Sequence, residues 1–160
     1  MKESKITINI SVADNINELP ETEVKLVNAA CDATKNSYAI YSQFNVGVAV
    51  LLGNGEIIKG SNQENMAYPS GLCAERVAMY YANSQYPGEP IVAIAIASAI
   101  NGVLNDKPVY PCGACRQALL QSEMRHDKPI KVIMYGNSMI QIVPDIKSLL
   151  PLSFDLDSYK

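Results

Sequence analysis

The stretch YPCGACRQ, residues 110–117, read together with GLCAER, residues 71–76, decides how the rest of the chain is organised. The first stretch carries Cys112 and Cys115 in a Cys-x-x-Cys pattern, and the second carries Cys73 with Glu75 two positions later. A proline directly before Cys112 is typical of the entry to a helix. The first stretch therefore predicts a helix start at Cys112. Apolar residues on one face of 73–83 predict a second helix start, at Cys73.

Three cysteines of this kind can bind one metal ion. Three thiolates hold a zinc ion and leave its fourth tetrahedral position for water, which is typical of catalytic zinc sites. Helix N-termini stabilise thiolates through free backbone N–H groups, and Arg76 and Arg116 are candidates to offset the remaining negative charge. Glu75, beside such a water, can move protons. Cys-x-Glu followed by Pro-Cys-x-x-Cys thus indicates zinc-assisted hydrolysis, as in base deaminases.

Other interpretations of these residues stay open. Cys112 and Cys115 could form a redox dithiol, or Cys31 could complete a closed structural zinc site. Glu75 could simply complement the dipole of a helix. For Cys31 a small buried apolar role is the main expectation, and His126, in a polar run, is expected in a solvated turn.

Composition and charge limit the kinds of molecule that the protein is expected to bind. The 160 residues are 48% hydrophobic and 18% charged, which suits one globular domain, and the net charge is −3 without any Lys/Arg run. A nucleic-acid or other polyanion partner is therefore not expected, and a free nucleoside is the better substrate. The apolar runs at 46–52 and 91–100 are too short to span a membrane, and no secretory signal is recognised, so a cytoplasmic location is expected.

The hydrophobic pattern predicts an α/β fold. Helices are expected at 21–37, 73–83 and 113–124, with a short helix near 144–150, and strands at 46–52, 57–60, 91–98, 130–135 and 139–143. The pair Asn54-Gly55 predicts a hairpin between the first two strands. The order favours a three-layer α/β/α sandwich around a five-stranded mixed sheet. Residues 21–160 would form this single domain, after an extension, 1–20, whose alternation at 5–12 predicts an edge strand.

Several blocks of the sequence resemble the small, homotetrameric, zinc-dependent cytidine deaminases. The matching blocks keep the same order over 21–154, and they are YSQFNVG at 41–47, GSNQEN at 60–65, CAER at 73–76, PCGACRQ at 111–117, and LLP at 149–151 with Phe154. The resemblance implies the cytidine deaminase-like fold and one zinc ion per subunit.

The resemblance also implies a role for each matching residue. Zinc would be bound by Cys73, Cys112 and Cys115, with Glu75 as the catalytic proton shuttle and Arg76 bonded to the ligand sulfurs. The substrate would contact the aromatic ring of Phe44, the ribose-binding Asn62 and Glu64, the backbone of Ala74 and the carbonyl of Tyr110. A neighbouring subunit's pocket would be completed by Tyr68 and Phe154.

The implied reaction is the hydrolysis of cytidine and 2′-deoxycytidine to uridine and 2′-deoxyuridine, with release of ammonia, in pyrimidine salvage. The implied assembly is a homotetramer with shared active sites. Two alternatives remain at this point: a related deaminase for a modified nucleoside or a nucleoside antibiotic, and a zinc-stabilised binding protein without turnover.

Overall fold

A computed structural model describes residues 1–155. These residues contain a mixed sheet of seven strands. The strands are β1 (Ser11–Ala13), β2 (Phe44–Leu52), β3 (Ile57–Ser61), β4 (Ile91–Ile100), β5 (Val103–Leu104), β6 (Lys131–Gly136) and β7 (Met139–Val143). The helices are α1 (Glu21–Ala33), α2 (Ala74–Gln85) and α3 (Gly113–His126). Short 3-10 turns lie at Ile16–Glu18, Thr34–Asn36, Tyr68–Ser70 and Lys147–Leu149.

The strand order is β1-β7-β6-β4-β2-β3, with β5 paired to the end of β4. β4 and β6 run parallel, and the other pairs are antiparallel. The central β4 is buried along nearly its whole length, as its continuous apolar sequence predicts for a strand covered on both faces. β2 and β3 form the predicted hairpin, in which Gly55 adopts a φ of 91°.

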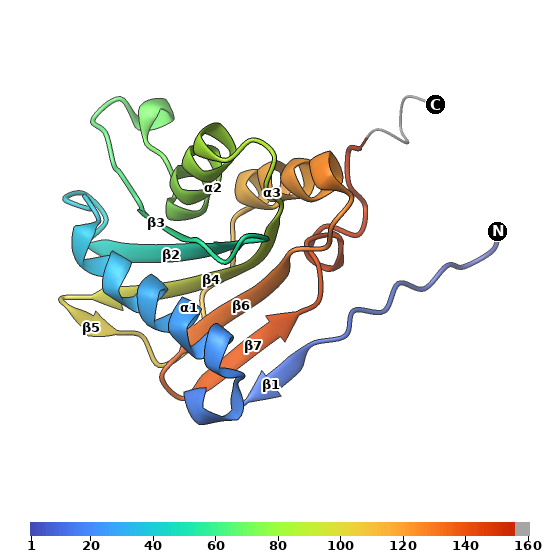
Figure 1. Ribbon diagram of the computed structural model, residues 1–160, viewed down its shortest axis with the longest axis horizontal. Helices are drawn as coiled ribbons and strands as arrows, with labels where there is room; N and C mark the ends of the chain where they lie inside the picture. Colours follow the sequence, from blue (N-terminus) through green and yellow to red (C-terminus); the bar gives the residue numbers. More distant parts are fainter. Residues whose placement is uncertain (156–160) are drawn as a thin grey trace.

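Helices cover both faces of the sheet (Figure 1). Residues of β2 alternate between two buried clusters: Val48 and Val50 pack in the cluster that contains residues of α2 and α3, whereas Ala49 packs in the cluster of α1. This alternation is the period of two expected of a strand. It confirms the predicted α/β/α sandwich.

Two glycines let helices approach the sheet closely. A Cβ on Gly47 of β2 would collide with the backbone of Ala30 in α1 and of Thr34 directly after it. A Cβ on Gly60 of β3 would lie 2.6 Å from the backbone nitrogen of Ala78 in α2. Each glycine therefore fixes how near one helix lies to the sheet.

The fold differs from the prediction at its edges. The sheet has seven strands within residues 1–155, rather than five, because β1 and the two-residue β5 add to it. The strand expected at 5–12 is present only as Ser11–Ala13, since its partner β7 ends at Val143, before a proline without an N–H to donate. The helix expected up to 37 ends at Ala33, and the helix expected near 144–150 is only a 3-10 turn.

Two further expectations concern the C-terminal end of the domain and membrane-spanning helices. Residues 156–160, included in the predicted domain, lie outside the described part of the chain. No helix within residues 1–155 combines the length and the apolar character needed to cross a bilayer.

Candidate active site

The N-termini of α2 and α3 meet on the same side of the sheet. Cys73 is the N-cap residue of α2, Cys112 is the N-cap residue of α3, and Cys115 lies in the first turn of α3. The carbonyl of Cys73 accepts the first helical hydrogen bonds, from the N–H groups of Arg76 and Val77, each at 3.1 Å. The predicted helix starts are confirmed.

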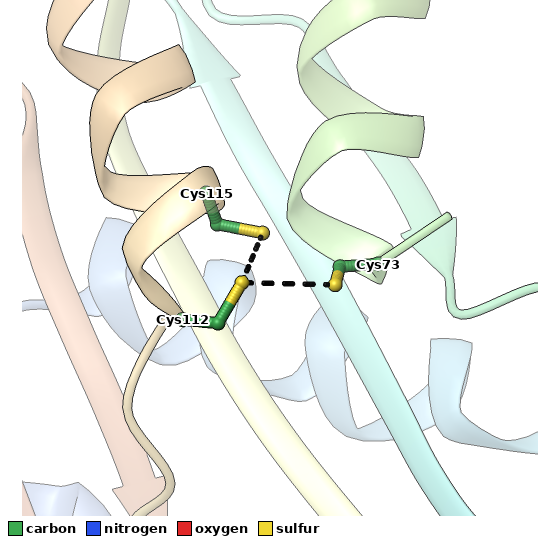
Figure 2. Close-up of side chains that lie close together, drawn as sticks. All are labelled: Cys73, Cys112 and Cys115. Carbon is green, nitrogen blue, oxygen red and sulfur yellow. Dashed lines mark hydrogen bonds between the residues drawn. The ribbon is translucent and has the colours of Figure 1, made fainter. Parts of the chain in front are cut away.

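The three sulfur atoms converge. The Sγ atoms of Cys73 and Cys112 are 3.9 Å apart, those of Cys112 and Cys115 are 3.5 Å apart, and all three lie within 4.8 Å of one another (Figure 2). A tetrahedral zinc ion with Zn–S bonds of about 2.3 Å spaces its sulfur ligands roughly 3.8 Å apart. The donor set and its spacing fit a zinc ion with three protein ligands.

Electrostatics favour one ionised sulfur in this cluster, that of Cys73. Hydrogen bonds from the Cys115 thiol and from the Arg76 guanidinium outweigh the effect of burial and lower the pKa of Cys73 to about 5. The hydrogen bond to Cys73 and burial instead raise the pKa of Cys115. Cys73 is thus the sulfur most ready to act as a thiolate ligand.

Glu75 lies directly beside this cluster, in the first turn of α2. Only 5% of its surface is exposed. Burial raises the pKa of Glu75 above its usual range, and the negative charge at Cys73 acts in the same direction. A buried carboxyl group whose proton affinity is raised suits proton transfer near neutral pH.

The two arginines have different partners. Nη2 of Arg76 donates to Sγ of Cys73 at 3.5 Å, and this bond raises the pKa of Arg76. Arg116 instead donates to backbone carbonyls, from Nε to Pro111 and from Nη1 to Leu149, both at 2.8 Å. The expectation that Arg116 also offsets charge at the sulfurs finds no contact in the described residues, and its role is to tie the chain after β7 to the segment that precedes Cys112.

An inner cavity of about 280 Å³ is lined by Cys73, Cys112 and Glu75. Its lining also includes Phe44 at the start of β2, Tyr110 and the buried Ala74. The lining residues are Ser42, Phe44, Val46, Asn62, Cys73, Ala74, Glu75, Ile96, Val109, Tyr110 and Cys112. The cavity is mostly apolar, with a few polar groups, as small-molecule sites usually are.

An outer cavity of about 580 Å³ adjoins the inner one and shares Ser42, Asn62 and Cys73 with it. Tyr68, whose side chain is 77% exposed, lies at this outer cavity with its ring edge-to-face against Tyr41, the centroids 6.2 Å apart. Glu64 and Arg76 are the charged residues in its lining.

Asn62 and Glu64 fix the loop that leads into β2. The Asn62 amide accepts from the N–H of Val46 at 2.8 Å and donates to the carbonyl of Phe44 at 2.9 Å. The Glu64 carboxylate accepts from the N–H of Tyr41 at 2.8 Å. The hydrogen bond of the Ser42 side chain, and after it that of Tyr41, lowers the pKa of Glu64. These contacts fix the backbone around Phe44, which lines the inner cavity.

Ser42 is a site residue to which sequence reasoning gave no role. Its hydroxyl accepts from the N–H of Phe44 at 3.1 Å, and it lines both cavities. A serine two positions before an aromatic residue at a strand start is compatible with such a local turn. That signal alone is too common in sequences to single it out.

The remaining predicted residues lie at the margins. The Tyr110 hydroxyl donates to Oε1 of Gln141 in β7 at 2.8 Å, which holds its backbone at the cavity. The side chain of Phe154 is 64% exposed and lines neither cavity, and its carbonyl accepts from Nε2 of Gln117 at 2.8 Å.

Cys31 lies in α1, on the opposite face of the sheet from the cysteine cluster. This position excludes Cys31 as a fourth ligand. Burial raises the pKa of Cys31 to about 11, as expected of an unreactive thiol. The Nε2 atom of His126 is buried without a hydrogen-bond partner in the described residues, so His126 is not the solvated turn residue that its sequence neighbours suggest.

Known proteins resemble this chain in sequence and in fold. The chain is 33% identical over 143 residues to the cytidine deaminase of Mycobacterium tuberculosis, covering 87% of this chain and 95% of the relative. It is 40% identical over 96 residues to the cytidine deaminase of Halalkalibacterium halodurans, covering 60% of this chain and 68% of the relative. The crystal structure of the cytidine deaminase from Burkholderia pseudomallei superposes with a TM-score of 0.69 at 31% identity, covering 81% of this chain and 97% of that one.

The family model described as the cytidine and deoxycytidylate deaminase zinc-binding region matches residues 20–128. This match includes both helix starts, all three clustered cysteines and Glu75. The protein therefore belongs to the family of cytidine and deoxycytidylate deaminases, enzymes that hydrolyse a C–N bond.

Proposed function

We propose that the protein deaminates cytidine and 2′-deoxycytidine hydrolytically, giving uridine and 2′-deoxyuridine with release of ammonia. One observation carries this proposal: three sulfurs within 4.8 Å of one another lie beside the buried Glu75, at the wall of the inner cavity. The cavity is large enough for a nucleobase and is lined mainly by apolar atoms, which suits a flat, neutral ring.

Cys73, Cys112 and Cys115 would hold one zinc ion per chain. When bound there, zinc supplies an activated water as the nucleophile at neutral pH. The hydrogen bond from Arg76 to Cys73 would lower the electron density that the thiolates donate to the metal, which keeps it an effective Lewis acid.

Glu75 would carry the protons of the reaction. It would accept a proton from the attacking water, deliver it to N3 of the pyrimidine, and pass the second proton to the amino group that leaves C4 as ammonia. One water is consumed, the C4–N bond breaks and a C4 carbonyl forms. The burial of Glu75 supports this role, because its raised pKa allows it to hold a proton between the two transfers.

Substrate orientation would come from residues that line the two cavities. Phe44 would pack on the pyrimidine, the backbone of Ala74 would contact the base, and the carbonyl of Tyr110 would accept from the amino group. Asn62 and Glu64 would bind the ribose hydroxyls. An ionised carboxylate offers about four acceptor sites, so Glu64 can accept a hydroxyl while it still holds the loop at Tyr41.

The outer cavity favours a nucleoside over its phosphorylated form. Arg76 is the one cation among the lining residues described, and its guanidinium already bonds Cys73. Glu64 would repel a phosphate group at the same place. Deoxycytidylate is therefore expected to be a poor substrate.

A homotetramer with shared active sites is part of the proposal. Large apolar and aromatic side chains are exposed around the outer cavity and on α2, namely Tyr38, Ile40, Tyr41, Met66, Tyr68, Tyr80 and Tyr81. Such a patch is typical of a protein interface. A neighbouring copy would cover it and would contribute Tyr68 and Phe154 to the adjacent pocket.

The cellular setting follows from the chemistry proposed. Ligand thiols must stay reduced, which is compatible with the cytoplasm. The reaction there would recover uridine compounds from cytidine compounds in pyrimidine salvage.

A substrate panel tests the proposal. Ammonia release by the zinc-loaded protein is measured with cytidine, 2′-deoxycytidine, free cytosine, deoxycytidylate and blasticidin S. We expect release from the two nucleosides and little from cytosine or deoxycytidylate. Turnover of blasticidin S alone would favour the rival function, deamination of a nucleoside antibiotic, and silence on all five would refute both.

A further inference from the structure

Residues 1–10, here called the N-terminal arm, leave the body of the protein at β1, the outermost strand of the sheet (Figure 1). All ten residues are exposed, and none belongs to a helix or strand. β1 pairs with β7 on one side only, through Ser11, Val12 and Ala13. The arm thus continues an edge strand whose outer side is unpaired among the described residues.

The arm has a strictly alternating sequence. Ile6, Ile8, Ile10 and Val12 occupy every second position, and Thr7, Asn9 and Ser11 lie between them. The four apolar side chains are 52%, 41%, 49% and 56% exposed, in that order. In an extended strand they all project to one face. A long, exposed, apolar edge strand is rare in proteins unless another strand pairs with it.

The partner strand β7 ends too early to pair with the arm. In the register of β1 and β7, in which Ser11 lies opposite Ile142, the next positions of β7 are its last residue, Val143, and then Pro144. Proline lacks the N–H group that a sheet ladder needs. The apolar alternation therefore extends past the end of its own partner strand.

We propose that the arm pairs antiparallel with the same arm of a second copy of this chain. The segment from Ile6 to Val12 is symmetric about Asn9, with apolar residues at equal distances on both sides. Antiparallel pairing centred on Asn9 places Ile6 opposite Val12 and Ile8 opposite Ile10. Every apolar side chain of one arm then lies beside an apolar side chain of the other.

Charged side chains stay outside the paired apolar segment in this register. Pairing centred on Asn9 places Lys5 of one arm opposite Ala13 of the other, and Lys5 is exposed and forms no ion pair within the described residues. The two sheets then continue into one another across the axis, and the outer edge of each β1 is covered.

This interface is separate from the patch around the outer cavity. The arm contributes no residue to the inner or the outer cavity, so pairing of the arms need not alter the activity of either copy. Pairing of the arms is therefore independent of the proposed reaction.

Two variants of the full, zinc-loaded chain test the pairing by analytical ultracentrifugation. Ile8→Glu places a charge on the apolar face, and its matched control, Thr7→Glu, adds the same charge one position away on the opposite face. We expect Ile8→Glu to weaken the arm-dependent association on the order of 100-fold or more, because two isoleucine contacts are lost in each pair. Thr7→Glu should associate nearly as the parent chain does. Equal effects of both variants, or no effect of either, would overturn the proposal.

The register is tested with Asn9→Cys and a short bifunctional thiol reagent. We expect a cross-linked dimer in which the introduced thiol of one chain is joined to the same introduced thiol of the other, identified by peptide mass spectrometry and absent from the parent chain. Attachment of the introduced thiol to another part of the partner, or no cross-link at all, would contradict symmetric pairing of the arms. Unchanged ammonia release in these variants would show that the site remains intact.

Discussion

The surroundings of a cysteine on the two faces of the sheet shift its pKa in opposite directions. On the face of α1, Cys31 is held in apolar surroundings, and burial raises its pKa to about 11. On the face of α2 and α3, Cys73 sits at a helix N-terminus beside Cys115 and Arg76, and its pKa falls to about 5. The groups around a cysteine decide whether it suits metal binding, and here the sheet separates the two kinds of surroundings.

Removing one sulfur from each face gives the largest contrast. Cys112→Ala should lose bound zinc and reduce activity at least about 1000-fold, because both zinc and its activated water depend on the complete ligand set. Cys31→Ala should keep its zinc and its turnover. Elemental analysis and ammonia release measure both, and zinc content that is unchanged in Cys112→Ala would exclude this residue as a ligand.

Glu75→Gln, on the face of α2 and α3, tests proton transfer separately from metal binding. The amide keeps the size of the side chain but cannot shuttle protons, so kcat should fall on the order of 100- to 10,000-fold. Zinc content should match that of the parent chain. Near-normal turnover by this variant would show that another group moves the protons.

Gly60 and Gly47, which let α2 and α1 approach the sheet, allow each face to be perturbed separately. Gly60→Ala puts a methyl group 2.6 Å from the nitrogen of Ala78, so α2 must move and carry Cys73 and Glu75 with it. We expect a loss of stability of about 1–3 kcal/mol and, in the folded fraction, a fall in kcat/KM of roughly tenfold or more.

Gly47→Ala is the matched variant on the other face. Its methyl group meets α1 at Ala30, so thermal unfolding should shift by a comparable amount, whereas kcat/KM of the folded protein should change much less. Similar losses of kcat/KM in both variants would mean that the faces are mechanically coupled.

The smallest effect concerns the thiol of Cys31. A pKa raised to about 11 keeps this thiol protonated near neutral pH, and its thiolate fraction rises tenfold for each pH unit up to that value. Alkylation of the zinc-loaded protein, followed by peptide mass spectrometry, should therefore label Cys31 slowly at neutral pH and faster as the pH rises. Rapid labelling of Cys31 at neutral pH would contradict the apolar surroundings described for it.

Local signals explain which parts of the fold could be predicted from sequence. The glycine turn at Asn54-Gly55, the apolar run of β4 and the proline before Cys112 each act over a few residues, and the elements they predict are present. β5 carries no periodic signal because it has two residues. The length of β1 depends on where β7 ends, which is a property of another part of the chain.

In the site, too, local sequence patterns could be predicted and contacts between distant segments could not. Cys-x-Glu and Cys-x-x-Cys each act at a single helix start, so a cluster of three cysteines could be predicted once both helices were recognised. The partners of Arg116, by contrast, are backbone carbonyls at Pro111 and Leu149, and no side-chain pattern records them. The bonds of Asn62 to the backbone of β2 likewise depend on the folded loop.

Zinc reconstitution tests the central claim most directly. The protein is stripped of metal with a chelator, zinc is added back in measured amounts, and ammonia release from cytidine is followed at each step. The account predicts that activity rises in proportion to zinc and levels off at one ion per chain, while Glu75→Gln takes up the same zinc with little turnover. Full activity in the stripped protein, or a fully loaded protein that leaves both cytidine and 2′-deoxycytidine unchanged, would contradict it.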